Sequence, residues 1–201
     1  MNLDAAALLA GFGRSYLFVI AAVLPIINPA AVAPIFLTLT EGADAATRAG
    51  LARRIATNSF VLMLVVLLVG SYVLDFFGIS LPIVRLGGGL IVAAAAWRLL
   101  TADQGTSDNR QALAQAFTPE QAQRQAFYPL TFPITCGPGS ISAIITVGVS
   151  LHDSRTAHGV TNALGGAAAL ASLAALIYFT YRYAQQILRP LGETGTLVFT
   201  R

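Results

Sequence analysis

The sequence predicts an all-α fold, a polytopic membrane helix bundle that forms a single integral membrane domain over residues 1–201. Hydrophobic residues make up 56% of the 201 residues and charged residues only 10%, whereas soluble domains carry about 25% charged residues. Apolar stretches recur along the chain, and a membrane-spanning helix needs about 20 such residues. Two of these stretches are interrupted by proline and glycine. Together, these features predict about five or six spans joined by short loops.

The apolar stretches place the individual spans. We expect them at residues 16–38, 55–74, 79–100, 127–151 and 162–183. Asp44 is a suitable N-cap for the helix that carries the second span, because its carboxylate can accept from free backbone N–H groups. Asp75 and Gly78 predict a tight turn after that span. The polar residues 101–125 predict the longest loop, on the cytoplasmic side.

The first and fourth spans are broken by residues that cannot continue a helix. The interruptions contain Pro25, Pro29 and Pro34 in segment 24–36, and Pro133, Gly137, Pro138 and Gly139 in segment 132–142. Proline removes a backbone donor and clashes with the preceding turn. In lipid the freed carbonyls need partners, so such breaks persist only inside protein or beside a water-filled cavity. Paired breaks, one in each half of a chain, are the best sequence pointer to the binding site of a transporter.

The two halves of the chain follow the same order of elements. Each has a broken span, a polar loop and then a helix expected to start near an asparagine, Asn58 or Asn162. We interpret residues 12–100 as one three-span repeat and residues 126–201 as a second. An odd number of spans inverts the second repeat relative to the first. The chain ends at Arg201, where a sixth span would begin, so we expect this helix to be missing.

Arginine placement predicts the orientation, because basic residues favour the cytoplasmic side. One side of the membrane would hold Arg48, Arg53, Arg54, Arg98, Arg110, Arg124, Arg182 and Arg189. The other side would hold Arg14 and Arg155. The N-terminus is therefore expected outside. We find no basic run interleaved with aromatic residues, so the composition does not favour a nucleic-acid partner.

A set of short motifs resembles the MarC family of bacterial inner-membrane proteins over nearly the whole chain. The motifs are Asn28-Pro29, Pro34-Ile35-Phe36, Phe77-Gly78-Ile79-Ser80-Leu81-Pro82, Arg85, Gly87-Gly88-Gly89-Leu90, Pro129-Leu130, Pro133 and Gly137-Pro138-Gly139-Ser140-Ile141. The resemblance implies six spans in two inverted repeats, a multi-pass location in the inner membrane and a place among small neutral amino acid transporters. This chain departs from the family at Ala30 and Ala31, where a glycine is usual, and at the missing sixth helix.

The chemistry of a zwitterionic amino acid selects the candidate site residues. Its carboxylate needs donors, which half-helix N-termini supply, and its ammonium needs acceptors, which unwound carbonyls supply. The substrate-binding candidates are Asn28, Pro29, Pro34, Thr135, Gly137, Pro138, Gly139, Ser140 and Ser142. Supporting candidates are Asn58, Arg85, Gly87, Gly88 and Asn162. The alternatives are interhelical bonds or helix caps for the asparagines, close helix crossing for the glycines, and for Arg85 a side chain that extends to the membrane surface or pairs with Asp75.

Other kinds of activity find less support in the sequence. The chain has no lysine, which excludes a Walker-type ATP site, and its motifs indicate no enzyme. His152, Asp153 and His158 indicate a metal site only weakly, so neither a metal nor a cofactor is expected. A proton or a sodium ion could drive transport. The alternatives are a channel or exporter for another small solute and a scaffold subunit without transport activity. The expected partners are a small-molecule substrate, the lipid bilayer and further copies of the chain.

Overall fold

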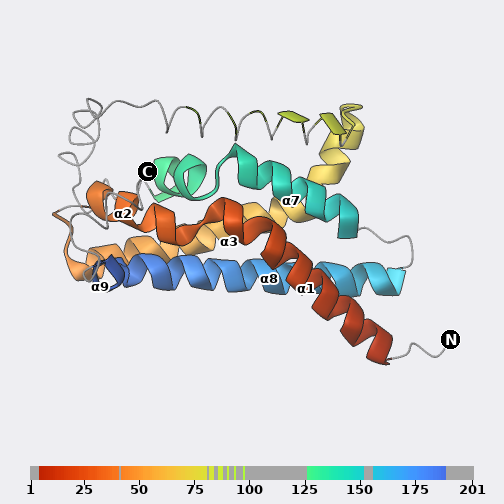
Figure 1. The fold of residues 1–201 in the computed structure, drawn as a ribbon, viewed down its shortest axis with the longest axis horizontal. Helices are drawn as coiled ribbons and strands as arrows, with labels where there is room; N and C mark the ends of the chain where they lie inside the picture. The colour runs from red at the N-terminus through yellow and green to blue at the C-terminus, as the bar shows by residue number, and fades with distance from the viewer. Residues whose placement is uncertain are drawn as a thin grey trace.

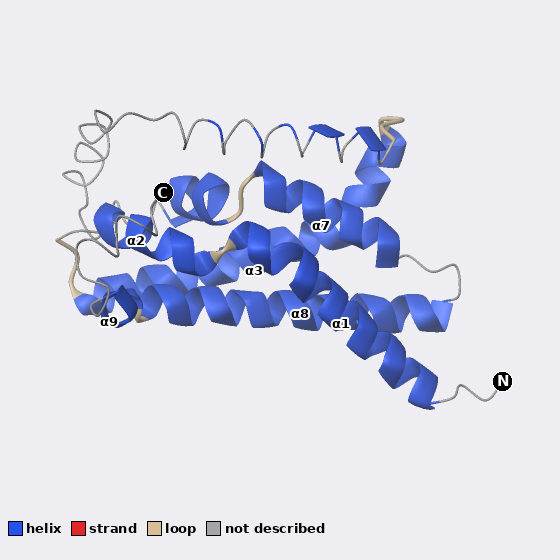
Figure 2. Cartoon of the chain, in the orientation of Figure 1, coloured by secondary structure: helices blue, strands red, loops and turns tan. Residues whose placement is uncertain are grey.

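The computed structural model describes residues 5–40, 42–80, 126–151 and 156–188, together with a few positions between 82 and 97. Figure 2 shows that these parts are helices joined by loops, without strands, which confirms the all-α prediction for the described residues. The elements are α1 (Ala5–Ile27), α2 (Pro29–Leu39), α3 (Ala45–Phe76), η2 (Ala126–Thr135), α7 (Pro138–Leu151), α8 (Thr156–Arg182) and α9 (Ala184–Leu188).

Three of the described helices are long and apolar enough to cross a bilayer. They cover Ala6–Ile27, Ala45–Gly70 and Gly159–Arg182, and the pair η2 and α7, bent by 71°, is a fourth candidate. Each reaches about the 20 residues that a span requires. The described part of the chain thus holds three to four candidate spans. The expected third span at 79–100 lies mostly outside the described residues, as does loop 101–125.

The two long helices α3 and α8 run antiparallel through the bundle (Figure 1). Of the remaining elements, α1, α2, η2 and α7 each pack mainly on the long helix that comes from the other half of the chain. From the first half of the chain, α1 and α2 pack against α8, whereas η2 and α7 from the second half pack against α3. Each broken segment therefore rests mainly on the long helix of the other half.

The helices extend beyond the predicted spans into polar sequence. α3 begins at Ala45 and α8 at Thr156, earlier than the predicted spans at 55 and 162. A hydropathy pattern marks only the apolar part of a helix, while polar turns at the membrane surface remain helical. Consequently Asn58 and Asn162 lie inside their helices, and the prediction that helices start near them was wrong.

The first break also lies elsewhere in its span than predicted. α1 runs without interruption from Ala5 to Ile27, through Pro25, and is itself long enough to cross the membrane. The break at Asn28 therefore follows a complete span instead of dividing one. The second break does divide an apolar segment, as predicted, because the bend of 71° separates η2 from α7.

Local signals determine both ends of α3. The Asp44 carboxylate accepts from the backbone N–H of Thr47 at 2.9 Å, as predicted for an N-cap. Hydrogen bonding from the Thr47 side chain, and next from its backbone N–H, lowers the pKa of Asp44 below its ordinary value. At the other end Gly78 has φ +65°, and the N–H of Ile79 donates to the carbonyl of Leu74 at 2.8 Å. This is the six-residue closure of a glycine-terminated helix, and it confirms the predicted turn.

Glycines allow the helices to approach backbone to backbone. A Cβ at Gly165 of α8 would lie 2.6 Å from the Phe12 carbonyl oxygen of α1, and one at Gly148 of α7 would lie 2.5 Å from the Leu67 carbonyl oxygen of α3. Such contacts replace the hydrophobic driving force that helices lack within lipid. The bundle therefore depends on small residues at these crossings.

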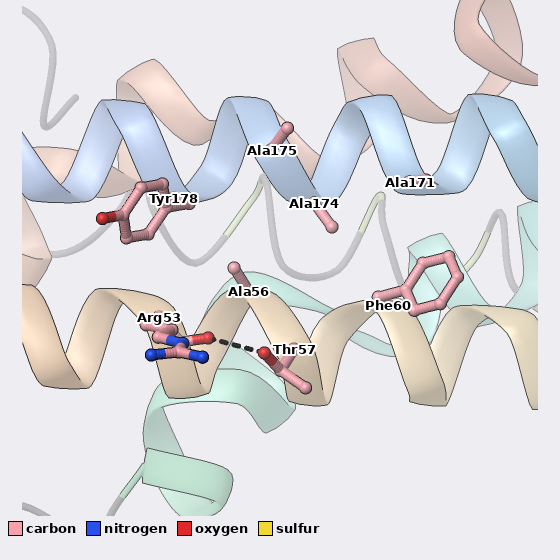
Figure 3. A pocket seen from close by; sticks show the side chains of 8 residues that line it. All are labelled: Arg53, Ala56, Thr57, Phe60, Ala171, Ala174, Ala175 and Tyr178. Carbon is pink, nitrogen blue, oxygen red and sulfur yellow. Dashed lines mark hydrogen bonds between the residues drawn. The ribbon is translucent and has the colours of Figure 1, made fainter.

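A groove lies between α3 and α8 near the start of α3 (Figure 3). It has a volume of about 490 Å³ and is lined by Arg53, Ala56, Thr57, Phe60, Ala171, Ala174, Ala175 and Tyr178. Alanines form most of its α8 wall, because they leave the space that longer side chains would fill.

We predict that Gly165→Ala and Gly148→Ala destabilise the bundle by about 1–3 kcal/mol each, the usual cost of overpacking. Matched controls are Gly13→Ala and Gly50→Ala, since a Cβ at either position meets no atom within 4 Å. These controls are expected to be neutral or slightly stabilising, because alanine is the better helix former. Thermal unfolding in detergent, followed by circular dichroism, measures the difference. Equal melting temperatures for all four variants would contradict the close-contact interpretation.

Candidate functional site

The first break is centred on Asn28, whose backbone adopts the left-handed conformation with φ 38° and ψ 69°. Asparagine tolerates this conformation better than most residues. Its N–H ends α1 by donating to Leu24 at 2.9 Å, and its carbonyl accepts from Ala31 at 3.1 Å at the start of α2. Its side chain also accepts from Ala31, at 3.4 Å, and remains exposed. The carboxamide is thus the polar group that this break presents.

The second break contains a tandem repeat that our sequence analysis missed. Tyr128-Pro129-Leu130-Thr131 is followed directly by Phe132-Pro133-Ile134-Thr135. Tyr128 and Phe132 adopt extended backbone angles inside η2, as expected for residues that precede proline. The pattern of aromatic residue, proline, aliphatic residue and threonine therefore sets the wide turns of this segment.

The threonines of this repeat donate their hydroxyl protons to carbonyls of the same segment. The hydroxyl of Thr131 donates to the Ala126 carbonyl and that of Thr135 to the Leu130 carbonyl, each at 2.7 Å. The N–H of Cys136 donates to the Thr131 carbonyl at 2.8 Å. All these bonds reach five residues back. A break in lipid needs such internal partners.

The start of α7 is tightly folded on itself. Gly137 precedes Pro138, which occupies the first helical position, where its missing N–H costs nothing. The Ser140 hydroxyl donates to the Gly137 carbonyl at 2.8 Å. A Cβ at Gly137 would lie 3.2 Å from the Pro133 carbonyl oxygen, so the backbone passes close to itself here. Gly139 and Ser142 lie in the first turns of the same helix and are half-buried.

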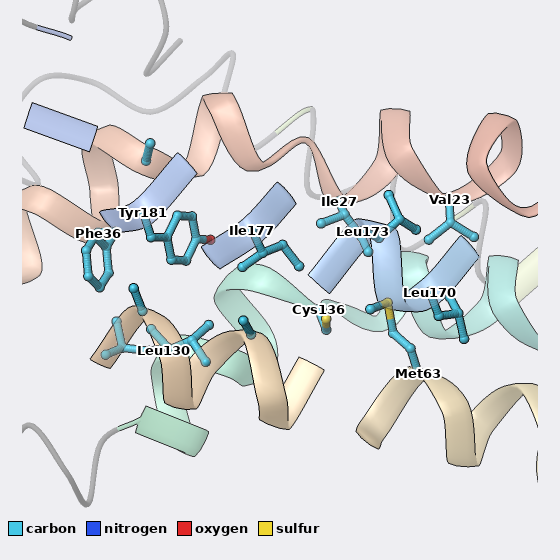
Figure 4. Close-up of a cluster of buried hydrophobic side chains, with 14 of the residues drawn as sticks. Val23, Ile27, Phe36, Met63, Leu130, Cys136, Leu170, Leu173, Ile177 and Tyr181 are labelled. Atoms are coloured by element: carbon cyan, nitrogen blue, oxygen red, sulfur yellow. The ribbon is translucent and has the colours of Figure 1, made fainter. Parts of the chain in front are cut away.

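A buried hydrogen bond joins the second break to α8. The hydroxyls of Thr135 and Tyr181 lie 2.9 Å apart, and because Thr135 donates to Leu130, Tyr181 is the donor between them. The Tyr181 ring stacks on Phe36 of α2 with centroids 4.8 Å apart. Figure 4 shows both rings at one end of the buried cluster. Tyr181 therefore connects the second break to the short helix that follows the first.

The two breaks belong to one hydrophobic core. Ile27, immediately before the first break, and Cys136, within the second, are both buried members of the same cluster. Figure 4 places both at the level of Leu173 and Ile177 on α8. Pro29 and Pro34 are buried beside this core on α2, which contacts η2. The structure thus brings the two predicted interruptions to the same part of the bundle.

Ser59 is a polar residue of this region that our list of candidates omitted. It is fully buried in α3, and its hydroxyl has no hydrogen-bond partner among the described residues. Its side chain faces the Cys136 thiol without acceptable hydrogen-bond geometry. The signal available in the sequence was a serine beside Asn58, but only the packing of α3 on η2 shows which of the two faces inward. Asn58 itself is half-buried.

The remaining supporting candidates separate into structural and undescribed positions. Asn162 accepts from the Ser15 hydroxyl at 3.0 Å and donates to the Leu151 carbonyl at 3.4 Å, so it connects α8 to α1 and α7. This is the interhelical bonding considered from the sequence. A Cβ at Gly87 would meet nothing within 4 Å. Arg85 and Gly88 lie outside the described residues.

The second break is closed in this conformation. Thr135, Cys136 and Ser140 are each exposed by 2% or less. Their polar side-chain atoms are occupied by internal hydrogen bonds, apart from the thiol. A ligand would reach these side chains only if the surrounding helices moved apart. Within the described ranges, no group of three His, Cys, Asp or Glu side chains could hold a metal ion.

We predict that Tyr181→Phe destabilises the protein by about 1–2 kcal/mol, the cost of losing one buried hydrogen bond, and that Thr135→Val costs more because it also removes the bond to the Leu130 carbonyl. The double variant is expected to lose little more than Thr135→Val alone, because that variant has already removed the bond to Tyr181. Thr57→Val is the control, since its exposed hydroxyl bonds only to the Arg53 carbonyl of its own helix. Unfolding free energies from a denaturant titration in detergent test this, and strict additivity of the two losses would refute the coupling.

Comparison with known proteins places the chain in a family. The sequence profile of the MarC family integral membrane proteins matches residues 14–201. The "UPF0056 inner membrane protein MarC" of Escherichia coli strain K12 is 30% identical over 180 residues, which cover 89% of this chain and 81% of that protein. The proteins of the same name from Shigella flexneri and from Escherichia coli O139:H28 match to the same extent. No solved structure matches. Because the profile match extends over most of its length, this chain belongs to the MarC family of integral membrane proteins.

Proposed function

We propose that this chain is a secondary transporter for small neutral solutes, with small amino acids such as glycine and alanine as the first substrates to test. The observation that carries the proposal is the convergence of two backbone breaks, from opposite halves of the chain, on one core against α8. Discontinuous helices at a repeat interface are the usual site of substrate binding in transporters. Membrane interiors tolerate such breaks only in protein or beside a cavity.

The crosswise packing supports a two-repeat architecture for this transporter. α1 and α2 rest on α8, and η2 and α7 rest on α3, so each broken segment packs against the long helix of the other half. Two structural units related by an inverted two-fold axis would exchange partners in this way. We therefore propose inverted repeats over 12–100 and 126–201, with alternating access through movement of the broken segments against α3 and α8.

The polar groups at the breaks favour a small substrate that both donates and accepts hydrogen bonds. Asn28 offers an exposed carboxamide, which contains both kinds of group. The oxygens of Thr135 and Ser140 can accept further bonds even while they donate internally. Ser59 offers an unused hydroxyl. Cys136, Gly137 and Gly139 are small, which leaves room for only a small ligand.

The cellular setting of the proposal follows from the relatives and from the arginines. The matching proteins are named as inner-membrane proteins, and the apolar helices suit a multi-pass location in the bacterial inner membrane. Arg48, Arg53 and Arg54 at the start of α3 favour the cytoplasm at that end, with the N-terminus outside. Coupling to protons or sodium and assembly with further copies are parts of the same proposal.

Uptake into proteoliposomes tests this function directly. The purified protein is reconstituted, and uptake of radiolabelled glycine and alanine is measured with proton and sodium gradients imposed separately. Saturable uptake driven by one gradient is the expected result. Flux that does not saturate and ignores both gradients would indicate a channel instead. An absence of uptake, with correctly folded protein, would contradict transport of these substrates.

Two matched pairs of variants test the site itself. Ser140→Ala is expected to reduce uptake by about tenfold, the effect of one hydrogen bond made by a small polar ligand. Ser150→Ala is the control, because Ser150 lies on the same helix, is exposed and makes a similar bond to the Thr146 carbonyl at 2.8 Å. Equal activity of the two variants would remove Ser140 from the site.

At the first break, substitution of Asn28 by glycine and by alanine distinguishes the role of the side chain from that of the backbone. Asn28→Gly keeps the left-handed conformation without strain, whereas Asn28→Ala is strained by about 1 kcal/mol. If the carboxamide binds substrate, both variants lose uptake. If only the backbone path matters, Asn28→Gly transports normally and just the alanine variant is impaired, which would contradict the assigned side-chain role.

Cys136 is a built-in reporter of opening, since it is the one cysteine of the chain and is 1% exposed. We predict that saturating substrate changes its rate of labelling by a membrane-permeant maleimide by about threefold or more, because binding shifts the balance of open and closed conformations. Mass spectrometry of the intact protein measures the rate. A rate that is insensitive to a substrate known to be transported would contradict movement at the second break.

A further inference from the structure

The groove between α3 and α8 has a charged end and an apolar body. Figure 3 shows Arg53 and Tyr178 at one end and Phe60 and Ala171 at the other. Between them Ala56, Ala174 and Ala175 form an apolar floor. Seven residues separate Arg53 from Phe60, a rise of about 10 Å along a helix. The groove therefore runs from the arginine-rich end of the bundle about a third of the way across a bilayer.

Arg53 supplies positive charge at the mouth of the groove. Its side chain is exposed, and no acidic side chain pairs with it among the described residues. The hydroxyl proton of the neighbouring Thr57 is already used in a hydrogen bond, because it is donated to the Arg53 carbonyl at 2.9 Å. None of the described residues that line the groove is acidic. An anion entering the mouth would thus meet Arg53 without a competing carboxylate from the described part of the chain.

Arg182 adds positive charge at the same end. Its guanidinium donates to the Tyr178 hydroxyl and lies 5.6 Å from the centroid of the Tyr178 ring. Because the Tyr178 hydroxyl oxygen accepts this bond, its own proton remains available for another acceptor. The mouth therefore combines the Arg53 guanidinium with the Tyr178 hydroxyl donor, and Arg182 adds positive charge behind Tyr178 without lining the groove itself.

From this arrangement we propose that the groove binds one anionic phospholipid, such as phosphatidylglycerol. The phosphate lies at Arg53 and Tyr178, and an acyl chain runs along the alanine floor towards Phe60. Charge complementarity identifies the lipid, because basic pockets between membrane helices on the cytoplasmic side bind anionic headgroups. A docked helix would need an acidic partner for Arg53 and an interface longer than about 10 Å.

Native mass spectrometry of the intact protein in detergent tests the proposal. The probes are dioleoyl phosphatidylglycerol and dioleoyl phosphatidylethanolamine, which share their acyl chains and differ in headgroup charge. The wild type is expected to prefer the anionic lipid. Arg53→Gln is expected to reduce this preference about fivefold, the effect of one basic side chain at an anionic membrane surface. Arg54→Gln is the matched control, since Arg54 is the next residue, is exposed and does not line the groove.

A second pair of variants tests the apolar part of the groove. Ala175 is exposed on the groove floor, so Ala175→Phe would fill the groove and is expected to weaken lipid binding about fivefold or more. Leu176 is exposed outside the groove, so Leu176→Phe is the control and is expected to leave lipid binding unchanged. Three outcomes would overturn the proposal. They are equal affinity of the wild type for both lipids, equal losses in Arg53→Gln and Arg54→Gln, and an Ala175→Phe variant that changes the oligomeric state while lipid binding persists. Glycerol phosphate that binds as tightly as the lipid would also contradict the acyl-chain contact.

Discussion

The architecture depends on one constraint, which is that no backbone group at a helix break can be left unpaired inside a membrane. At both breaks part of this pairing is local. At the first break the main chain of Asn28 ends α1 and starts α2 with its own donor and acceptor. At the second, the hydroxyls of Thr131 and Thr135 donate to the Ala126 and Leu130 carbonyls of the same segment. A helix break inside a membrane costs free energy, so we expect its shape to serve the function of the protein.

α8 is the element that holds both breaks in place. It receives α1 through Gly165, which lies against the Phe12 carbonyl, and it receives η2 through the bond between Tyr181 and Thr135. Gly166, the next residue, touches the side chains of Leu67 and Leu151, so that α3 and α7 meet α8 at the same level. Close contacts at small residues and the Tyr181 hydrogen bond thus hold α8 against its neighbours.

Sequence alone predicted the features that depend on local chemistry. Proline and glycine marked the segments that contain the breaks, although the first break follows a complete span instead of dividing one. Asp44 marked the start of α3, and Gly78 marked its end. The features that it missed depend on which helices are neighbours. Ser59 is inward-facing only because α3 packs on η2, and Tyr181 has a partner only because α8 passes the second break. The predicted spans were shorter than the helices that contain them, because polar surface turns carry no hydropathy signal.

The internal hydrogen bonds at the second break also constrain how a substrate could bind. Ser140 and Thr135 hold their protons on carbonyls of the same segment. A ligand that needs those donors must displace bonds worth about 1 kcal/mol each in net terms, whereas the Ser59 hydroxyl is free to bond at no such cost. Ser59 is itself fully buried, so a ligand could reach its hydroxyl only after the helices around the second break had moved apart.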